Sequence, residues 1–235
     1  MFLWGSCSSD STEKHQKNRN HVIDVRSNIQ EIAWQGEPIH AFSEVLALNE
    51  CLLICDYHSF DKHIHIVDKN NFKFLASTAP KGQGPGEIAN IGQVVTDENH
   101  RRFYVNDHGK QKIFRYDLDS VLAHPDYRPV PRMSMNEAEF PSGYHYIHDT
   151  LCIGAIIKPT GNYGFNKNSA RWNMNTGEIK PMPDFHPEIK KKRYDIAVSP
   201  QHGICVESYQ RHDLLTIRTL SGDLKYNIYG PHWEI

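Results

Sequence analysis

The stretch Lys81–Ile88, with the sequence KGQGPGEI, carries residue types that can bind an anion. Backbone N–H groups in glycine-rich turns can cradle phosphate. Its G-x-G-x-G spacing differs, however, from the G-x-G-x-x-G and G-x-x-x-x-G-K-[ST] fingerprints of nucleotide sites. Residues 91–96 also have the pattern of a strand, whereas a phosphate loop leads into the N-terminus of a helix. The stretch is therefore a weak candidate for nucleotide binding.

The same stretch has the composition of a tight crossover between two structural repeats, and we favour this interpretation. Glycine supplies positive φ angles without steric cost, and proline fixes its own φ. Glu87 can pair with a backbone amide or with a basic side chain of the neighbouring repeat. The candidate loop residues are Gly82, Gly84, Pro85, Gly86 and Glu87.

The chain has 15 histidines, so metal binding has to be considered. His63 and His65 lie two apart on a predicted strand and therefore share a face, with aspartates nearby in the sequence. They supply two ligands where a catalytic zinc site has three. A second cluster, Tyr144–Asp149, contains two further histidines. We interpret all of these as exposed strand histidines and keep His63 and His65 as weak candidate metal ligands.

The motifs of hydrolytic enzymes are missing from the sequence. It contains neither a G-x-S-x-G elbow nor an H-E-x-x-H motif. Paired carboxylates such as Asp117 and Asp119 stand at strand ends, where aspartate hydrogen-bonds the backbone of turns. We therefore name no catalytic residue and expect no cofactor.

Composition and charge exclude several partners. The formal net charge of −2 gives no electrostatic footprint for nucleic acid or for an anionic membrane surface. The basic run Lys190–Arg193 is interpreted as a solvated loop. No apolar run approaches the ~18 residues that a spanning helix needs.

The N-terminal residues Met1–Cys7 are apolar and end in small residues before a cysteine, and a polar stretch follows to residue 20. They resemble the end of a bacterial lipoprotein signal, which would make Cys7 the lipidated residue and residues 1–20 a signal remnant and polar tether. The apolar part is shorter than the ~7–15 residues of an h-region, and no positive n-region precedes it. Either the true start lies upstream or Cys7 is an ordinary thiol. We favour the lipoprotein, anchored in the cell envelope and facing the periplasm or the cell surface, with the lipid as the only membrane contact.

The other four cysteines lie in or beside short apolar runs. Cys51 and Cys55 would be roughly 13 Å apart on one strand, too far for a disulfide. We expect buried free thiols that pack as small hydrophobic side chains. The four are Cys51, Cys55, Cys152 and Cys205.

Apolar runs recur with a period of about 50 residues, which is typical of repeat architectures. After each run come a polar loop, a second strand rich in β-branched and aromatic residues, a turn and a further strand, and an earlier strand opens each unit. Four antiparallel strands per repeat form a propeller blade. The four aligned runs are residues 52–55, 103–106, 151–154 and 204–207.

Helices contribute little to the predicted fold. Residues 118–123 can form a single turn, which the proline-rich segment after it would stop. The longest polar connection, residues 158–169, is the best candidate for a functional insertion.

The glycine-proline motif at 82–87, the strand pair 53–56 and 64–68, and the closing Tyr229-Gly230-Pro231 together resemble the TolB-like six-bladed β-propeller proteins of Bacteroidetes. The resemblance runs from about residue 21 to the end. It implies an all-β propeller, over residues 21–235, of which about four blades of six are present. Because the chain stops where a loop should lead to a fifth blade, we expect a truncated gene or a fragment. A closed four-bladed ring is the less favoured alternative, since four blades is the lower end of the typical range.

Many proteins of that family are predicted lipoproteins of unknown function, so the resemblance leaves several functions open. The first is a non-enzymatic binding or scaffolding module for a glycan, a peptide or an envelope protein. The second is a metal-assisted hydrolase or lyase that uses the central funnel. The third is a truncated copy without independent activity, whose unclosed sheets would favour self-association.

Overall fold

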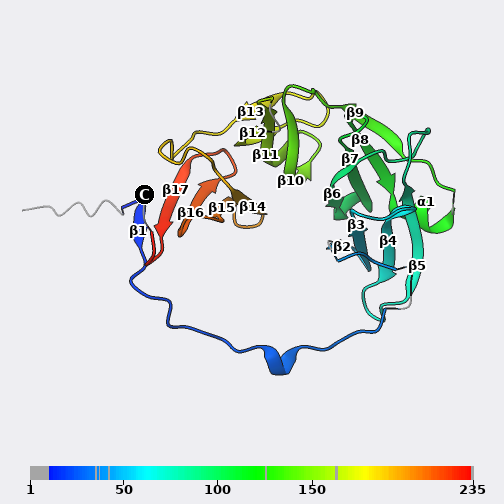
Figure 1. Cartoon of the computed structure of the whole chain (residues 1–235), viewed down its shortest axis with the longest axis horizontal. Helices are drawn as coiled ribbons and strands as arrows, with labels where there is room; N and C mark the ends of the chain where they lie inside the picture. The colour runs from blue at the N-terminus through cyan, green and yellow to red at the C-terminus, as the bar shows by residue number, and fades with distance from the viewer. Residues whose placement is uncertain are drawn as a thin grey trace, which may run out of the picture. The chain divides into compact units, whose positions relative to one another are not determined.

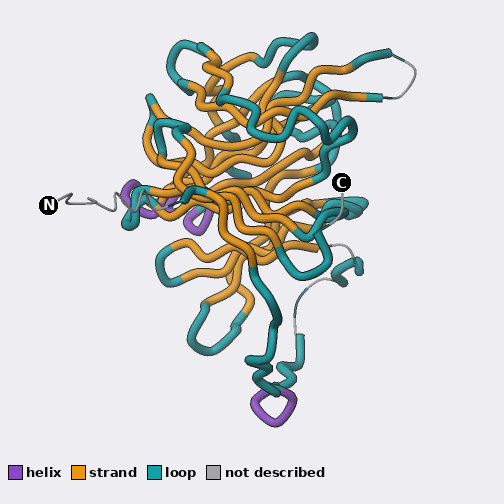
Figure 2. Tube along the Cα trace, turned by 90° about the vertical axis from the view of Figure 1, so that its left-hand side faces the viewer, coloured by secondary structure: helices purple, strands orange, loops and turns teal. Residues whose placement is uncertain are grey.

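The structure of the chain, a computed structural model, describes residues 11–34, 36, 38–41, 43–124, 126–161 and 164–233. Most of the ordered backbone within these ranges is β-strand (Figure 2). The helical elements are α1 (Leu118–Ala123) and two 3-10 turns at Arg26–Asn28 and Glu98–His100. The predicted lipidation site Cys7 and the terminal Glu234 and Ile235 lie outside the described residues.

Residues 24–181 form one compact unit that holds three four-stranded sheets. Each sheet is an antiparallel meander in which consecutive strands pair, and the three follow one another along the chain (Figure 1). The first sheet contains β2 (Ser43–Leu48), β3 (Cys51–Asp56), β4 (Lys62–Asp68) and β5 (Phe74–Pro80). The second contains β6 (Ile91–Asp97), β7 (Arg102–Asp107), β8 (Lys112–Asp117) and β9 (Val130–Ser134). The third contains β10 (Phe140–His148), β11 (Leu151–Pro159), β12 (Phe165–Trp172) and β13 (Ile179–Pro181).

The other compact unit combines the N-terminal residues 1–23 with residues 182–235. Its sheet is a meander of β14 (Tyr194–Ser199), β15 (Ile204–Tyr209), β16 (Leu214–Thr219) and β17 (Leu224–Tyr229). A fifth strand, β1 (Glu13–His15), pairs with β17 in parallel.

Strand β1 lies inside the stretch for which the sequence predicts a polar tether. Its backbone joins β17 through the Asn227 amide, which donates to Thr12 at 2.8 Å, and the Gln16 amide, which donates to Tyr229 at 2.9 Å. The His15 ring stacks on the Tyr229 ring at 4.8 Å. An unpaired sheet edge presents backbone donors and acceptors, and this short polar segment satisfies those of β17.

The four-stranded antiparallel repeat predicted from the sequence is confirmed. Each of the four aligned apolar runs lies in the second strand of its sheet, namely β3, β7, β11 and β15. The single helical turn at residues 118–123 is also confirmed, because the Asp117 carboxylate accepts a hydrogen bond from the Ser120 amide at 2.9 Å and caps α1.

One local prediction is wrong. Residues 158–169 are not a polar insertion, because β11 and β12 continue their pairing to Pro159 and Phe165 and form one long hairpin. In the first sheet, β5 begins at Phe74, after a turn. The Asp68 carboxylate accepts from the Asn70 amide at 2.8 Å and prolongs the preceding turn.

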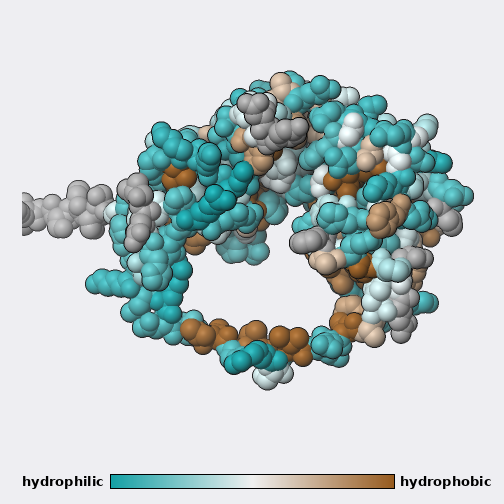
Figure 3. All heavy atoms as spheres, viewed as in Figure 1, coloured by the Kyte–Doolittle hydropathy of each residue, from teal (hydrophilic) through white to brown (hydrophobic). Residues whose placement is uncertain are grey.

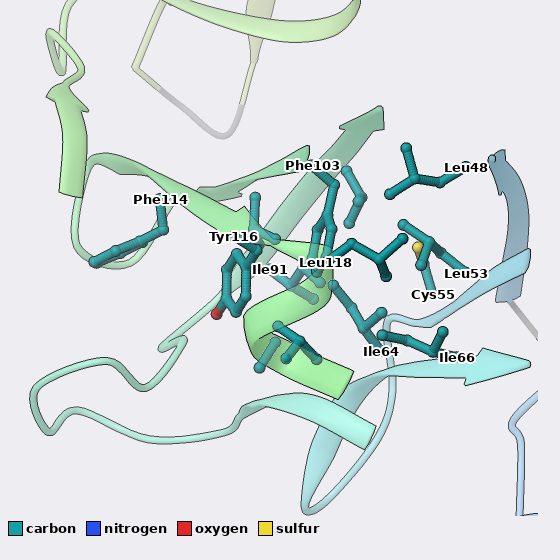
Figure 4. Packing of buried hydrophobic residues seen from close by; sticks show 14 of the residues in the cluster. Leu48, Leu53, Cys55, Ile64, Ile66, Ile91, Phe103, Phe114, Tyr116 and Leu118 are labelled. Atoms are coloured by element: carbon teal, nitrogen blue, oxygen red, sulfur yellow. The ribbon is translucent and has the colours of Figure 1, made fainter. Parts of the chain in front are cut away.

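One hydrophobic cluster fills the space between the first two sheets (Figure 4). Leu53 and Ile64 from the first sheet and Phe103 from the second are completely buried. Phe103 stacks on Tyr116 with ring centroids 4.8 Å apart. Adjacent sheets of a propeller pack face to face, and this cluster is the physical basis of that packing in the first half of the chain.

The four cysteines predicted to be buried and free are confirmed as such. Burial raises the pKa of the Cys205 thiol to about 11 and also raises the pKa of the other three thiols. A thiol must ionise to act as a nucleophile, and burial disfavours that ionisation in all four.

We expect the four thiols to react with a disulfide reagent such as DTNB on the order of 100-fold more slowly in the folded protein than in urea. The measurement is made on a Cys7→Ser variant, so that the N-terminal thiol adds no signal. Rapid reaction of one or more thiols in the folded protein would contradict the burial described here.

The segment Val22–Ile32 carries most of the large hydrophobic side chains that are highly exposed (Figure 3). Val22 is 84% exposed and Ile29 is 69% exposed. Within the described part of the chain, no helix is long and apolar enough to cross a membrane.

Candidate functional site

The predicted crossover is the segment of residues 81–90, which connects β5 of the first sheet to β6 of the second. The Gly82 amide donates to the Ile88 carbonyl at 3.0 Å, and the Ile88 amide donates back to Pro80 at 2.8 Å. The Glu87 carboxylate accepts from the Gly84 amide at 2.7 Å. The loop therefore hydrogen-bonds to itself, as the crossover interpretation requires.

The glycines of the loop are needed for different reasons. Gly86 has a φ of +75°, a conformation that favours glycine. Gly84 has an ordinary φ, but a Cβ there would come within 2.9 Å of the Glu87 carboxylate. The prediction that the glycines supply positive φ thus holds for Gly86, whereas close approach of the Glu87 side chain explains Gly84.

Two basic side chains from outside the loop hold it in place. The Lys110 ammonium donates to the Gly84 carbonyl and to the Glu87 carbonyl, both at 2.7 Å. The Arg128 guanidinium, which precedes β9, donates to the Pro85 carbonyl at 2.5 Å. The loop presents its carbonyl groups to two cations, and this is the opposite of an anion cradle.

The end of the crossover is fixed by a single buried carboxylate. Asp107, the last residue of β7, accepts from the Ala89 amide at 2.8 Å and from the Asn90 amide at 3.0 Å. It also accepts from Gly109 at 2.9 Å and Lys110 at 3.1 Å. Asp107 therefore fixes the end of the loop and also the backbone of Lys110, from which the Lys110 side chain extends to the loop.

A groove of about 740 Å³ runs between the loop and the outer strands of the second sheet. The loop contributes one wall, and β8 and β9 contribute the other. The lining residues are Gln83, Gly84, Pro85, Gly86, Lys110, Lys112, Phe114, Arg128, Pro129 and Pro131.

The groove combines positive charge with a rigid apolar surface. Its charged lining residues are Lys110, Lys112 and Arg128, and no acidic residue lines it. Lys112 is exposed. Three prolines and Phe114 form the apolar part. Such a surface suits an anionic ligand that also has apolar faces.

The structure separates the candidate metal ligands from this groove. His63 and His65 both lie on β4, but each is almost completely buried rather than exposed as expected, with 2% and 3% exposure. The His63 ring donates from Nδ1 to the Asp56 carbonyl at 3.1 Å. Burial lowers the pKa of His63 below its ordinary value. No group of three possible metal ligands occurs among the residues that the structure describes.

The three cations of the groove were not predicted from the sequence. Lys110 and Lys112 follow the Asp107 turn, and Arg128 stands beside the prolines that were interpreted only as a helix stop. The one available signal was the pair Pro129 and Pro131, because prolines just before and within a strand mark a sheet edge. The cations gather only because β8 and β9 lie beside the loop.

Gly86→Ala is expected to destabilise the unit of residues 24–181 by about 1–3 kcal/mol. A Cβ at this position would lie 2.7 Å from Arg128 Cδ, in addition to the cost of positive φ. Urea unfolding measures the effect. Gly161→Ala is the matched control, because Gly161 has a φ of +73° and no described residue within 4 Å of its Cβ position. Equal losses in the two variants would show that the contact with Arg128 is unimportant.

The sequence model of a protein family described as a 6-bladed beta-propeller, DUF5128, matches residues 35–141. No curated protein matches the chain. The crystal structure of a member of the DUF4221 family from Bacteroides vulgatus is similar, with a TM-score of 0.54 and 13% sequence identity. The match covers 79% of this chain and 56% of that chain.

A protein of unknown function from Bacteroides caccae gives a TM-score of 0.44 at 11% identity, over 77% of this chain and 58% of that chain. The chain thus spans little more than half the length of these two structures. Together with the four-stranded antiparallel sheets, the comparisons show that the fold is that of a β-propeller.

Proposed function

We propose that this chain is a non-enzymatic binding module and that its groove holds an acidic glycan. The observation that carries the proposal is the charge of the lining, in which three cations face the groove without any acidic side chain. The chain as a whole has a net charge of −2, so the positive groove is a local feature. Carboxylate or sulfate groups of a polysaccharide would pair with Lys112 and Arg128, while the prolines and Phe114 would contact sugar faces.

The edge strand of the groove favours a glycan over an extended peptide. Strand β9 is the last strand of its sheet. A peptide that adds to a sheet edge needs backbone N–H groups from that edge. Pro131 lies within β9 and Pro129 directly precedes it, and neither has an N–H group. At these two positions the edge offers no backbone donor, which favours contacts through side chains, as when a charged polysaccharide binds.

The test is isothermal titration of the full chain with polygalacturonate, with dextran as the neutral control and poly-glutamate as the acidic peptide control. We expect polygalacturonate to bind with an affinity that falls as salt is raised, and dextran to show no binding in the groove. If poly-glutamate binds and polygalacturonate does not, the ligand is an acidic peptide rather than a glycan. Absence of binding to both anionic polymers would contradict the proposal.

We also propose that the module works in the cell envelope, anchored through lipidated Cys7. Support comes from the apolar residues before Cys7 and the polar residues after it. In a bacterial host, the protein is expected in the membrane fraction, and Cys7→Ser is expected to move most of it to the soluble fraction. Ser8→Ala is the control for an unrelated change at the same place. An unchanged distribution of Cys7→Ser would exclude the anchor.

A further inference from the structure

A second cavity, of about 490 Å³, lies between the first sheet and α1 and shares no lining residue with the groove. Small-molecule sites are typically concave, about 300–1,000 Å³ in volume, and mostly apolar with a few fixed polar groups. This pocket fits that description. Its apolar lining comes from Pro38, Phe60, Phe74, Leu75, Val121 and Leu122.

One polar group of the pocket, the His40 ring, is fixed by a buried carboxylate. His40 Nδ1 lies 2.7 Å from the Asp56 carboxylate, which is completely buried. Burial alone would raise the pKa of Asp56, but hydrogen bonds from the His40 ring and from the amides of His40 and His58 lower it below its ordinary value. Asp56 is therefore ionised at neutral pH and accepts the Nδ1 proton.

This arrangement determines what His40 offers to a ligand. A ring that carries its proton on Nδ1 has a lone pair on Nε2, which can accept a hydrogen bond. Nε2 lies on the side of the ring away from the buried carboxylate, and the His40 side chain is 38% exposed. The pocket therefore contains an oriented acceptor for a hydroxyl group.

The second sheet shows that a turn of this kind does not need the histidine ring. Asp107 ends β7 as Asp56 ends β3, and four backbone amides satisfy it. The Asp56 carboxylate instead accepts hydrogen bonds from two backbone amides and from the His40 ring. The ring is thus an addition specific to the sheet that holds the pocket.

Phe60 supplies a flat apolar surface beside this acceptor. Its side chain is 85% exposed, although it lines the pocket and lies edge-on to the His40 ring at 5.5 Å. Exposed aromatic rings next to a pocket provide contact area at small conformational cost. Asp61 and Lys62 also line the pocket and carry opposite charges, so the site favours a neutral ligand.

We propose that this pocket binds a neutral sugar ring, one face of which packs on Phe60 while a hydroxyl group donates to His40 Nε2. Lys62 and Asp61 are placed to hydrogen-bond further hydroxyl groups. The proposal is independent of the groove, because none of the pocket's lining residues lines the groove.

The experiment is saturation-transfer and chemical-shift NMR of the full chain with methyl α-D-glucopyranoside, methyl α-D-mannopyranoside and N-acetyl-D-glucosamine. We expect one or more of them to bind and to shift the signals of His40 and Phe60. Phe60→Ala is expected to weaken binding about tenfold, and Phe60→Tyr to retain it. His40→Phe, which keeps a ring but removes both nitrogens, is expected to weaken binding by a similar factor.

Val45→Ala is the control for loss of an exposed hydrophobic side chain, since Val45 is 59% exposed and does not line the pocket. A Lys112→Glu/Arg128→Glu variant should bind the sugars normally, which separates this site from the groove. The proposal is overturned if none of the three sugars binds. It is also overturned if Phe60→Ala and His40→Phe, shown by circular dichroism to be folded, bind as tightly as the unmodified chain.

Discussion

The Lys112→Glu/Arg128→Glu variant is expected to lose affinity for polygalacturonate by about 100-fold at low salt. An exposed ion pair contributes up to about 1 kcal/mol, and reversal of a charge replaces that attraction by a repulsion of similar size. Lys110 is left unchanged because its ammonium holds two loop carbonyls, those of Gly84 and Glu87, whereas Arg128 holds only that of Pro85. Isothermal titration at two salt concentrations measures both the loss and its electrostatic origin.

The matched control is Lys190→Glu/Lys191→Glu, which changes the net charge of the chain equally at two exposed lysines. We expect that variant to retain most of its affinity, because its charges lie outside the groove. If both double variants lose affinity equally, binding depends on total charge alone. The groove would then have no special role.

Glu207→Ala is expected to destabilise the sheet of β14–β17 by about 3–5 kcal/mol, because it leaves a buried charge without its partner. Arg218 and Glu207 lie on β16 and β15, and their side chains are 3% and 2% exposed. The guanidinium contacts both carboxylate oxygens, at 2.8 and 3.1 Å. It also lies over the Phe185 ring at 4.3 Å. Hydrogen exchange of the β14–β17 amides reports the loss for this unit specifically.

The double variant Glu207→Leu/Arg218→Met provides the comparison. Replacing both partners of a buried pair by apolar side chains of similar size is often close to neutral. We therefore expect the double variant to be more stable than Glu207→Ala. If the two are equally unstable, the loss comes from packing around the residues rather than from the unpaired charge.

Much of the strand order follows from the sequence, because local patterns decide it. The apolar run at residues 52–55 and its counterparts in the other repeats are short and rich in hydrophobic residues, as the second strands of the sheets must be. The connection between β11 and β12 was misjudged. The hairpin of β11 and β12 runs through polar residues such as Lys158 and Asn166, which pair across the strands. Backbone pairing there continues without a hydrophobic signal.

The burial of His63 and His65 shows a further limit of predicting burial from the pattern of a single strand. Alternation along β4 was expected to leave one face exposed, yet five consecutive residues of this strand are buried. A strand whose sheet packs against neighbours on both sides is buried on both faces. A pattern in one strand does not reveal what covers its second face.

The loop at Lys81–Ile88 can be identified from the sequence as a crossover, because the conformational freedom of glycine and the fixed φ of proline are properties of single residues. The sequence also determined the repeat, the buried thiols and the short helix, all of which depend on residues close together in the chain. Only the tertiary structure decided what faces this loop. Lys110, Lys112 and Arg128 come from separate turns and strands, and His40 reaches Asp56 across 16 residues. Their chemistry arises from spatial proximity, which strand pairing and sheet packing create.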